Sequence, residues 1–346
     1  MLKEHFVTLF DSLFLPQGLA LHMSMERHIG KYTLWILCMD DEVHEVLSRL
    51  NLPNVRLLQL SKLETPELLA VKPLRGKGEY CWTLTPFTAR FVFEADAEVS
   101  RVTYLDADMW FRKNPEPIFR EFDASGKDVL ITDHAYAPEY DQSTTSGQYC
   151  VQFLTFTRDG GEVVRKWWEE KCIEWCFARF EDGKFGDQKY LDDWPIRFAD
   201  SVHVLTNKEL ILAPWNATRF PYGNAVAWHF HRLRIVSFSG ESRMVSMNGS
   251  TVVVVTSAVP PDADVLNSEQ SLAAEYWGYT LPECTRDCVY RPYVNDLRAV
   301  IGGLLNINVL VRPQQLQQTS TISYSFLGYL KMGLRKHVRR LLGQTS

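Results

Sequence analysis

Arg101-Val-Thr-Tyr-Leu-Asp-Ala-Asp-Met-Trp-Phe111 is the stretch of this 346-residue chain that decides the fold. Its apolar run leads into two carboxylates, Asp106 and Asp108, separated by a single residue. In an extended segment residues i and i+2 point to the same face, so the stretch predicts a strand whose end presents both carboxylates to one site. Carboxylate oxygens suit Mg²⁺ or Mn²⁺, and substrate phosphates commonly complete the coordination of such ions.

An Asp-x-Asp pattern is short, and most of its occurrences are solvated turns or caps, so its setting matters. Here Asn114-Pro-Glu-Pro117 follows and blocks the continuation of a regular element. The pair is therefore predicted at a strand terminus, where open α/β sheets place their ligand sites.

The residues around this stretch alternate β-like runs with helical patterns. The expected order is a strand at 5–10, a helix at 19–27, a strand at 33–38, a helix at 41–50 and a strand at 55–60. A helix with Thr85 as N-cap and Pro86 at its first position leads to the Asp106 strand, and strands at 128–132 and 149–156 follow. This order predicts an α/β fold with a mostly parallel twisted sheet and flanking helices.

Composition excludes several classes of protein. The chain is 46% hydrophobic, enough for a large core, yet no apolar run approaches the length of about 18 residues that crosses a bilayer. The first eight residues include an acid and a His where a secretory signal would need apolar residues. Seven scattered cysteines do not form the dense, even-numbered framework of a secreted scaffold. We expect a cytoplasmic protein with reduced thiols.

Four of the cysteines are candidates for a zinc site: Cys172, Cys176, Cys284 and Cys288. The first two fall in the Trp-rich segment 167–180, whose apolar periodicity predicts a helix, so core packing explains them better. Cys-x₃-Cys on a helix is also not the usual zinc knuckle.

Charge is divided unevenly along the chain. The last 50 residues hold seven Lys or Arg and no Asp or Glu, so the net charge of −5 splits into +7 there and −12 in residues 1–296. A nucleic-acid role for the whole chain is therefore disfavoured. We expect a catalytic domain at 1–238, an extension at 239–320 with a hairpin at Asn248-Gly249, and a basic amphipathic helix at 321–346.

Three further features accompany the carboxylate pair. They are Asp187-Gln188 after a glycine, Trp228-His-Phe-His-Arg-Leu-Arg234, and Tyr149-Cys-Val-Gln-Phe153 before an apolar run. Together with the α/β order they resemble the GT-A (Rossmann-like) nucleotide-sugar glycosyltransferases, especially the family-8-like group of glycogenin and the bacterial lipooligosaccharide galactosyltransferases. The resemblance covers residues 5–235 and implies a metal-dependent hexosyltransferase with a nucleotide-sugar donor, UDP-sugar above all.

The resemblance assigns the metal, Mn²⁺ or Mg²⁺, to Asp106, Asp108 and His229, and lets Asp106 also reach the ribose of the donor. His231 is the alternative ligand, because alternate side chains of a strand share a face. A neutral imidazole beside carboxylates suits Mn²⁺. The competing interpretation is that both histidines are structural.

Other roles also follow from the resemblance. Asp187 and Gln188 match the pair under the transferred sugar and are the predicted catalytic residues, although Asp187 is also a candidate helix N-cap. Thr8 and Asp11 end the first strand, where the family holds base and ribose. Arg234 stands where the family has a lysine that neutralises the diphosphate.

Two positions depart from the family pattern. Cys150 and Gln152 stand where related sequences have Asn and Gly, residues that approach the donor sugar. The larger side chains leave the identity of the sugar open.

The family retains anomeric configuration, which implies an α-linked product from a UDP-α-sugar. The basic helix at 321–346 is interpreted as a peripheral attachment to the inner face of the plasma membrane, with packing on the protein's own core as the alternative. Membrane attachment would fit a glycan or lipid-linked glycan acceptor in surface polysaccharide or lipopolysaccharide assembly.

Two other functions use similar features. A sugar-nucleotide nucleotidyltransferase shares the metal and diphosphate chemistry, but the segment 10–18 after the first strand has no Gly-rich phosphate loop. A non-catalytic carbohydrate-binding protein on a transferase fold is the second alternative.

Overall fold

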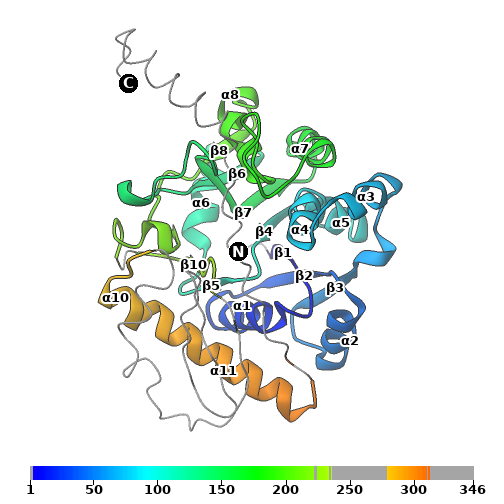
Figure 1. Ribbon diagram of the computed structural model, residues 1–346, viewed down its shortest axis with the longest axis vertical. Helices are drawn as coiled ribbons and strands as arrows, with labels where there is room; N and C mark the ends of the chain where they lie inside the picture. The colour runs from blue at the N-terminus through cyan, green and yellow to red at the C-terminus, as the bar shows by residue number, and fades with distance from the viewer. Residues whose placement is uncertain (1–2, 222–223, 234, 236–278, 310, 312–346) are drawn as a thin grey trace.

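The computed structural model describes residues 3–221, 224–233, 235, 279–309 and 311. Three sequence predictions lie outside these residues: the role of Arg234, the hairpin at Asn248-Gly249 and the basic helix at 321–346. Within the described residues, helices cover both faces of a central sheet (Figure 1).

The central sheet has seven strands in the order β3-β2-β1-β4-β7-β6-β8. These strands are β1 (Glu4–Phe10), β2 (Tyr32–Cys38), β3 (Val55–Gln59), β4 (Arg101–Leu105), β6 (Val129–Asp133), β7 (Tyr149–Thr157) and β8 (Val202–Val204). Neighbouring strands are parallel except around β7, which runs antiparallel to both β4 and β6. The predicted mostly parallel sheet is confirmed.

A second sheet joins three short strands in the order β5-β10-β9. These are β5 (Met109–Phe111), β9 (Ile211–Leu212) and β10 (Ala227–His229). β10 is antiparallel to β5 and parallel to β9. This small sheet brings residues near 110 and 229 together.

Two hydrophobic cores lie on opposite faces of the central sheet. One face carries α1 (Leu15–His28), α2 (Asp41–Leu50), α6 (Glu116–Ser125) and α11 (Arg291–Asn306). The other carries α3 (Pro66–Val71), α4 (Lys77–Leu84), α5 (Phe87–Ala95), α7 (Glu162–Glu174) and α8 (Trp194–Arg197). Because successive strand side chains point to opposite faces, Phe6 and Val7 of β1 enter different cores. Burying a side chain of this size stabilises the fold by about 1.5–3 kcal/mol.

Shorter helical segments connect these elements. They are η1 (Leu60–Lys62), η2 (Lys72–Leu74), η3 (Pro138–Tyr140), η4 (Gln188–Asp193), η5 (Pro214–Asn216), α10 (Glu283–Thr285) and the π-helical turn η6 (Arg286–Tyr290).

Several predicted helix boundaries are wrong. Thr85 is not an N-cap: it has helical dihedral angles at the end of α4, and its hydroxyl donates to the Cys81 carbonyl. Pro86 in turn precedes α5. The Trp-rich helix, α7, ends at Glu174, so Cys176 lies beyond it, although the predicted core packing of Cys172 and Cys176 is confirmed because both are buried.

Helix α11, part of the predicted extension at 239–320, lies alongside α1 and packs on the small sheet (Figure 1). The rings of Tyr293 and Phe230 stack 3.6 Å apart at 12°. The Asp296 carboxylate accepts a 2.7 Å hydrogen bond from Trp110 Nε1 and pairs with Arg27. The described part of this extension therefore supports β5 and β10, while the boundary between residues 238 and 239 stays a prediction.

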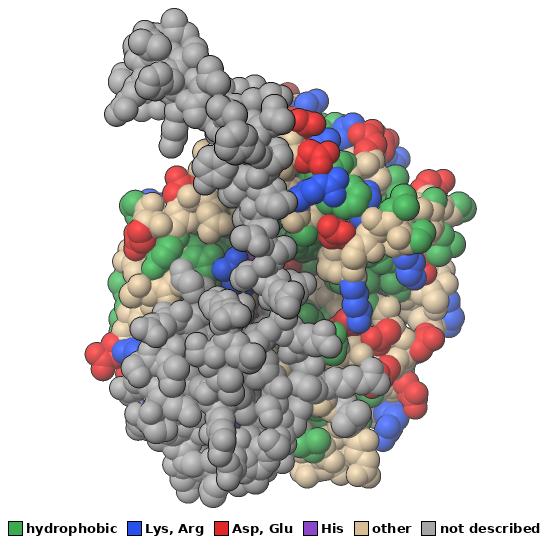
Figure 2. Space-filling view, in the orientation of Figure 1, with side chains coloured by type: hydrophobic (Ala, Val, Ile, Leu, Met, Phe, Trp, Pro, Cys, Tyr) green, Lys and Arg blue, Asp and Glu red, His purple; other side chains and the backbone are tan. Residues whose placement is uncertain are grey.

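Charged groups on the described surface are mixed in sign. Figure 2 shows acidic and basic side chains interspersed on the coloured part of the visible face. Among the described residues, no helix has the length and apolar character that crossing a membrane requires.

Candidate functional site

The carboxyl ends of the parallel strands define the edge of the sheet where the candidate site lies. From β1 the chain builds β2 and β3 on one side and then returns to form β4 on the other side of β1. Asp11 follows β1 and Asp106 follows β4. Because β7 is antiparallel, its first residues begin at this same edge. The edge between β1 and β4 is a topological switch point, the usual ligand position in open α/β sheets.

The Asp106–Met109 segment is a turn. The Met109 amide donates to the Asp106 carbonyl at 3.1 Å, and the predicted extended geometry is wrong at this point. The predicted strand terminus is confirmed, because β4 ends at Leu105. Strand β5 follows at once and pairs Met109 with His229 of β10. The small sheet thus carries a residue more than a hundred positions away to the carboxylate pair.

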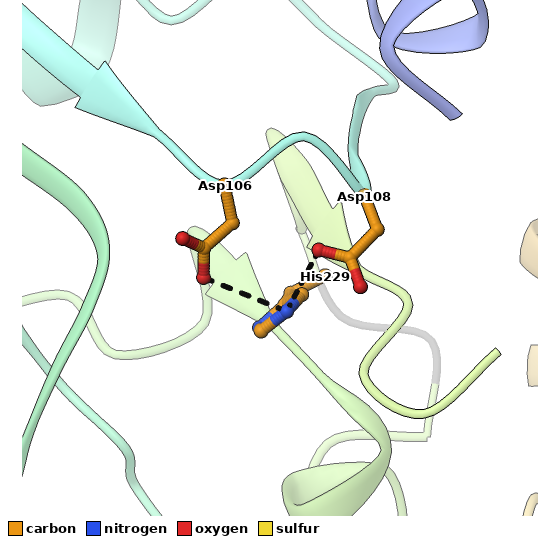
Figure 3. A group of neighbouring side chains, drawn as sticks. All are labelled: Asp106, Asp108 and His229. Carbon is orange, nitrogen blue, oxygen red and sulfur yellow. Dashed lines mark ion pairs between the residues drawn. The ribbon is translucent and has the colours of Figure 1, made fainter. Parts of the chain in front are cut away.

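Asp106, Asp108 and His229 form one group whose candidate ligand atoms all lie within 4.8 Å of one another. Figure 3 shows both carboxylates turned toward the imidazole. Nε2 of His229 lies 3.1 Å from Asp108 Oδ1 and 3.7 Å from Asp106 Oδ2.

The residues present fit a divalent ion. Adjacent ligands of an octahedral ion with bonds of 2.0–2.1 Å are about 3 Å apart, close to the observed separations. Two carboxylates and one imidazole form a donor set that suits Mn²⁺ and also accommodates Mg²⁺.

Behind the imidazole lies Gln152 of β7. His229 Nδ1 donates to Gln152 Oε1 at 2.7 Å, and Gln152 is 0% exposed. An amide oxygen only accepts hydrogen bonds, so Nδ1 carries a proton, and in a neutral ring the lone pair therefore resides on Nε2. The sequence pattern predicts Gln152 beside the sugar and contains no signal for this contact.

His231 lies outside the group of three ligand residues. Strand β10 ends at His229, so the alternation that would place both histidines on one face does not continue. The half-buried His231 ring instead lies 5.3 Å from the Trp215 ring, and Trp215 also contacts His229 at 5.4 Å. Within the described residues, the geometry selects His229 as the candidate ligand.

Burial makes the Asp106 carboxylate harder to ionise. Burial raises the pKa of Asp106; His229 opposes this effect when its ring is protonated, and the Asp108 charge adds to it. The Tyr104 hydroxyl donates to Asp106 Oδ1 at 2.9 Å. Burial, reinforced by nearby Asp106, Asp187 and Asp108, also raises the pKa of the Cys150 thiol well above its usual range. A cation in this site would relieve a concentrated negative charge.

Asp187 is buried at the start of η4. Burial, with the Asp106 charge second, raises the pKa of Asp187 to about 8. Its side chain makes no helix-capping hydrogen bond, and its Oδ2 has no hydrogen-bond partner among the described residues. The Trp168 indole donates to its carbonyl at 2.9 Å. Asp187 therefore occupies the predicted N-cap position of η4 without capping it through its side chain, and its catalytic role stays a prediction.

Gln188 lies next to Asp187 but has a partner of its own. Its Nε2 donates to the Ser146 carbonyl at 2.7 Å. Gly186, just before the pair, has φ of +53°, and a Cβ there would lie 3.3 Å from the Trp82 ring. The left-handed backbone and the close Trp82 ring both favour glycine at position 186.

The residues predicted to hold base and ribose occupy the end of β1. Thr8 is 0% exposed, and its hydroxyl has no hydrogen-bond partner among the described residues. Asp11 Oδ1 accepts hydrogen bonds from the amides of Leu13 and Phe14, and its Oδ2 pairs with Lys77 at 2.6 Å. The local turn thus holds the Asp11 carboxylate in place. The sequence pattern does not indicate that Lys77 is its ion-pair partner.

His229 also has a cluster of rings beside it that the sequence does not predict. This cluster, the aromatic wall, consists of His134, Tyr136 and Trp215. The rings of His134 and Tyr136 stack 4.6 Å apart, and Trp215 meets His134 edge-on at 5.1 Å while its indole donates to the His134 carbonyl. Burial lowers the pKa of His134 to about 4, so this ring is neutral at physiological pH. His134 and Tyr136 are neighbours in the chain, but Trp215 lies 81 positions after His134, and no sequence pattern links it to them.

Comparisons with solved structures and with known sequences both find similar proteins. Solved structures similar to this chain include mouse xyloside xylosyltransferase 1, at 15% identity and a TM-score of 0.45 over 66% of this chain and 98% of that one. The galactosyltransferase LgtC, crystallised with donor and acceptor sugar analogues, is 14% identical with a TM-score of 0.45 over 82% and 99%. GlyE of Streptococcus pneumoniae is 12% identical with a TM-score of 0.47 over 91% and 66%.

No protein-family model matches the chain. Two proteins of Bacillus subtilis are more similar in sequence. YfnD is 29% identical over 306 residues, which is 87% of this chain and 90% of YfnD. YfnF is 33% identical over 245 residues, which is 68% of this chain and 80% of YfnF. The chain belongs to the same protein family as YfnF of Bacillus subtilis.

Proposed function

We propose that the protein is a metal-dependent glycosyltransferase that moves a hexose from a nucleotide diphosphate donor to a glycan acceptor. The observation that carries the proposal is the convergence of Asp106, Asp108 and His229 at the switch-point edge of an α/β sheet. Three protein ligands leave room for phosphate oxygens, which is typical of ions that bind together with a substrate diphosphate.

In the proposed reaction the bond between the anomeric carbon and the diphosphate oxygen breaks, the acceptor hydroxyl oxygen bonds to the anomeric carbon, and the hydroxyl proton passes to the departing nucleoside diphosphate. A bound Mn²⁺ or Mg²⁺ would supply positive charge to the departing diphosphate. The chain's part is to hold Asp106, Asp108 and His229 Nε2 around one point. Tyr104 orients the first of these carboxylates.

UDP-sugar is the proposed donor. Asp11 and the buried Thr8 lie at the end of β1 next to the Asp106 strand, a position suited to holding base and ribose. Lys77, paired with Asp11, adds a cation at this edge. Arg234 is assigned to the diphosphate by resemblance alone.

Asp187 and Gln188 are the proposed residues under the transferred sugar. A carboxylate near the anomeric carbon stabilises the positive charge that develops there as the leaving group departs. The Asp187 Oδ2 atom, buried without a hydrogen-bond partner in the described residues, supports this role because substrate would supply the missing contact. Retention of configuration is proposed from the family resemblance.

The proposed acceptor is a glycan or lipid-linked glycan of surface polysaccharide or lipopolysaccharide assembly. The support is the sequence of the basic amphipathic segment 321–346, which would place the protein on the inner face of the plasma membrane. We propose a cytoplasmic, peripheral enzyme.

A donor screen tests the function. The full chain is incubated with UDP-, GDP- and other activated sugars and Mn²⁺, and nucleotide release is measured. Acceptors are soluble glycans and glycolipids in anionic vesicles. We expect release from one UDP-sugar and an at least 100-fold loss, about 2.7 kcal/mol, in Asp108→Asn, because one metal ligand is removed. Asp159→Asn, on a surface turn outside the ligand group, is the matched control.

Three outcomes would contradict parts of the proposal. Absence of binding or cleavage for every sugar nucleotide would contradict the transferase. Formation of UTP from UDP-sugar and pyrophosphate would support nucleotidyl transfer instead. Equal activity on vesicle-borne acceptors by the full chain and by a chain truncated after Thr319 would contradict the membrane role.

A further inference from the structure

We infer that Gln152 is a positioning residue for the metal centre, which turns His229 so that its Nε2 faces the ion. The inference rests on the proposed metal-dependent function and deepens it. The glycosyltransferase family that the chain resembles has glycine at this position, so the family pattern does not supply the contact between Gln152 and His229.

The first support is the direction of the hydrogen bond. His229 Nδ1 and Gln152 Oε1 are 2.7 Å apart, and the oxygen has no proton to donate. In the neutral ring, which is the form that binds metals, this bond therefore selects the tautomer that leaves Nε2 unprotonated. That nitrogen lies 3.1 Å from the nearer carboxylate oxygen of Asp108. A hydrogen bond to the far nitrogen commonly orients histidine ligands and raises their basicity.

The second support is that Gln152 contacts two of the three ligand residues. Its carbonyl accepts a 3.3 Å hydrogen bond from the Asp106 amide, while its side chain reaches His229. Asp106 follows a strand of the central sheet, whereas His229 ends a strand of the small sheet. Gln152 thus contacts the ligand residue that follows the central sheet and the one that belongs to the small sheet.

The third support is the free-energy cost of burying the Gln152 side chain. Gln152 is 0% exposed, and its Nε2 has no hydrogen-bond partner among the described residues. Burying an unpaired polar group costs stability, and a glycine or an apolar side chain would avoid that cost. The contact with His229 accounts for an amide here. The presence of glutamine at this position is thus explained without the predicted position of its side chain beside the donor sugar.

The test uses the full chain and measures Mn²⁺ binding directly. Free Mn²⁺ is followed by electron paramagnetic resonance, and the nitrogen coupling of the bound ion is followed by electron spin-echo modulation. The variants are Gln152→Met, which keeps the length but lacks an amide oxygen, and Gln152→Glu, which keeps an acceptor. The control is Gln17→Met, because Gln17 is also 0% exposed and its amide nitrogen also has no partner among the described residues.

The expected result is a Kd for Mn²⁺ raised about 10- to 100-fold in Gln152→Met, together with a weakened histidine nitrogen coupling. Gln152→Glu retains both affinity and coupling, because a carboxylate also accepts from Nδ1–H. Gln17→Met leaves both unchanged. Thermal melting of each variant separates a loss of the site from a loss of the fold.

Two patterns overturn the inference while leaving the proposed function intact. In the first, the unsubstituted chain binds Mn²⁺, and folded Gln152→Met binds it with the same Kd and coupling. In the second, folded Gln152→Glu loses binding as severely as Gln152→Met does. If the unsubstituted chain itself binds no Mn²⁺, the proposed metal-dependent function fails and the inference fails with it.

Discussion

At the residue scale, the candidate metal centre divides into a part that the sequence predicts and a part that it does not. Asp106 and Asp108 are predictable because an apolar run ends at them, and His229 because the resembling family has a histidine there. The contact between His229 and Gln152 is not predictable, since the two residues are 77 positions apart and neither belongs to a local pattern that indicates it. The same holds for the aromatic wall.

Asp187 gives a prediction in pH. Its pKa of about 8 in the folded protein lies above the ordinary value of 3.8 for Asp in an unfolded chain, so the folded state binds an extra proton between these values. Stability therefore falls as pH rises through this window and levels off above it. Asp187→Asn removes the titrating group. With metal chelated, the Tm of this variant should therefore exceed that of the unsubstituted chain by a margin that grows from pH 5 to pH 8.

An advantage of about 1 kcal/mol at pH 8 corresponds to about 2–4 °C in Tm. Scanning calorimetry at several pH values measures this difference, with Asp159→Asn as the exposed control. Parallel Tm curves for Asp187→Asn and the unsubstituted chain would refute the assignment. Donor cleavage by Asp187→Asn should fall even though the protein is more stable.

At the scale of elements, strand and helix order is predictable where periodicity is long. β1, β2 and the helices between β1 and β3 agree with their apolar patterns, although α1 begins at Leu15, four residues before its predicted start. The antiparallel direction of β7 is not predictable, because a strand buried on both faces has no directional signal. The small sheet is not predictable from the sequence either, because strands of two or three residues have too few positions to show alternation.

Helix α11 supports the small sheet, which gives a prediction about Asp296. Asp296→Ala removes the acceptor of the Trp110 indole, whose residue is 6% exposed, and the ion-pair partner of Arg27. Leaving a buried donor unsatisfied costs about 1–3 kcal/mol, so we expect a loss of this size in the urea unfolding free energy.

The matched control is Asp287→Ala on the neighbouring η6 segment. The Asp287 side chain is 47% exposed and pairs with Arg291 only as an i,i+4 surface pair. Such pairs are worth about 0.3–0.5 kcal/mol, so the control should lose less than that. Equal losses in the two variants would contradict a supporting role for the Asp296 contact.

At the scale of the whole molecule, two sheets meet at one edge. The central sheet brings Asp11, Asp106 and the start of β7 to its switch point, and the small sheet adds His229. The α/β class and the mostly parallel sheet are predictable from the order of strands and helices. The convergence on one point depends on the pairing of β5 with β10, which only the folded chain reveals.

The central claim is that this convergence binds a metal and a nucleotide diphosphate together. Isothermal titration of UDP into the full chain tests it most directly, once with Mn²⁺ and once with the metal chelated. We predict that UDP binds at least 10-fold more tightly with Mn²⁺, a difference of about 1.4 kcal/mol, and that Asp108→Asn abolishes the difference. Equal UDP affinity with and without Mn²⁺, or a metal effect that survives Asp108→Asn, would contradict the account.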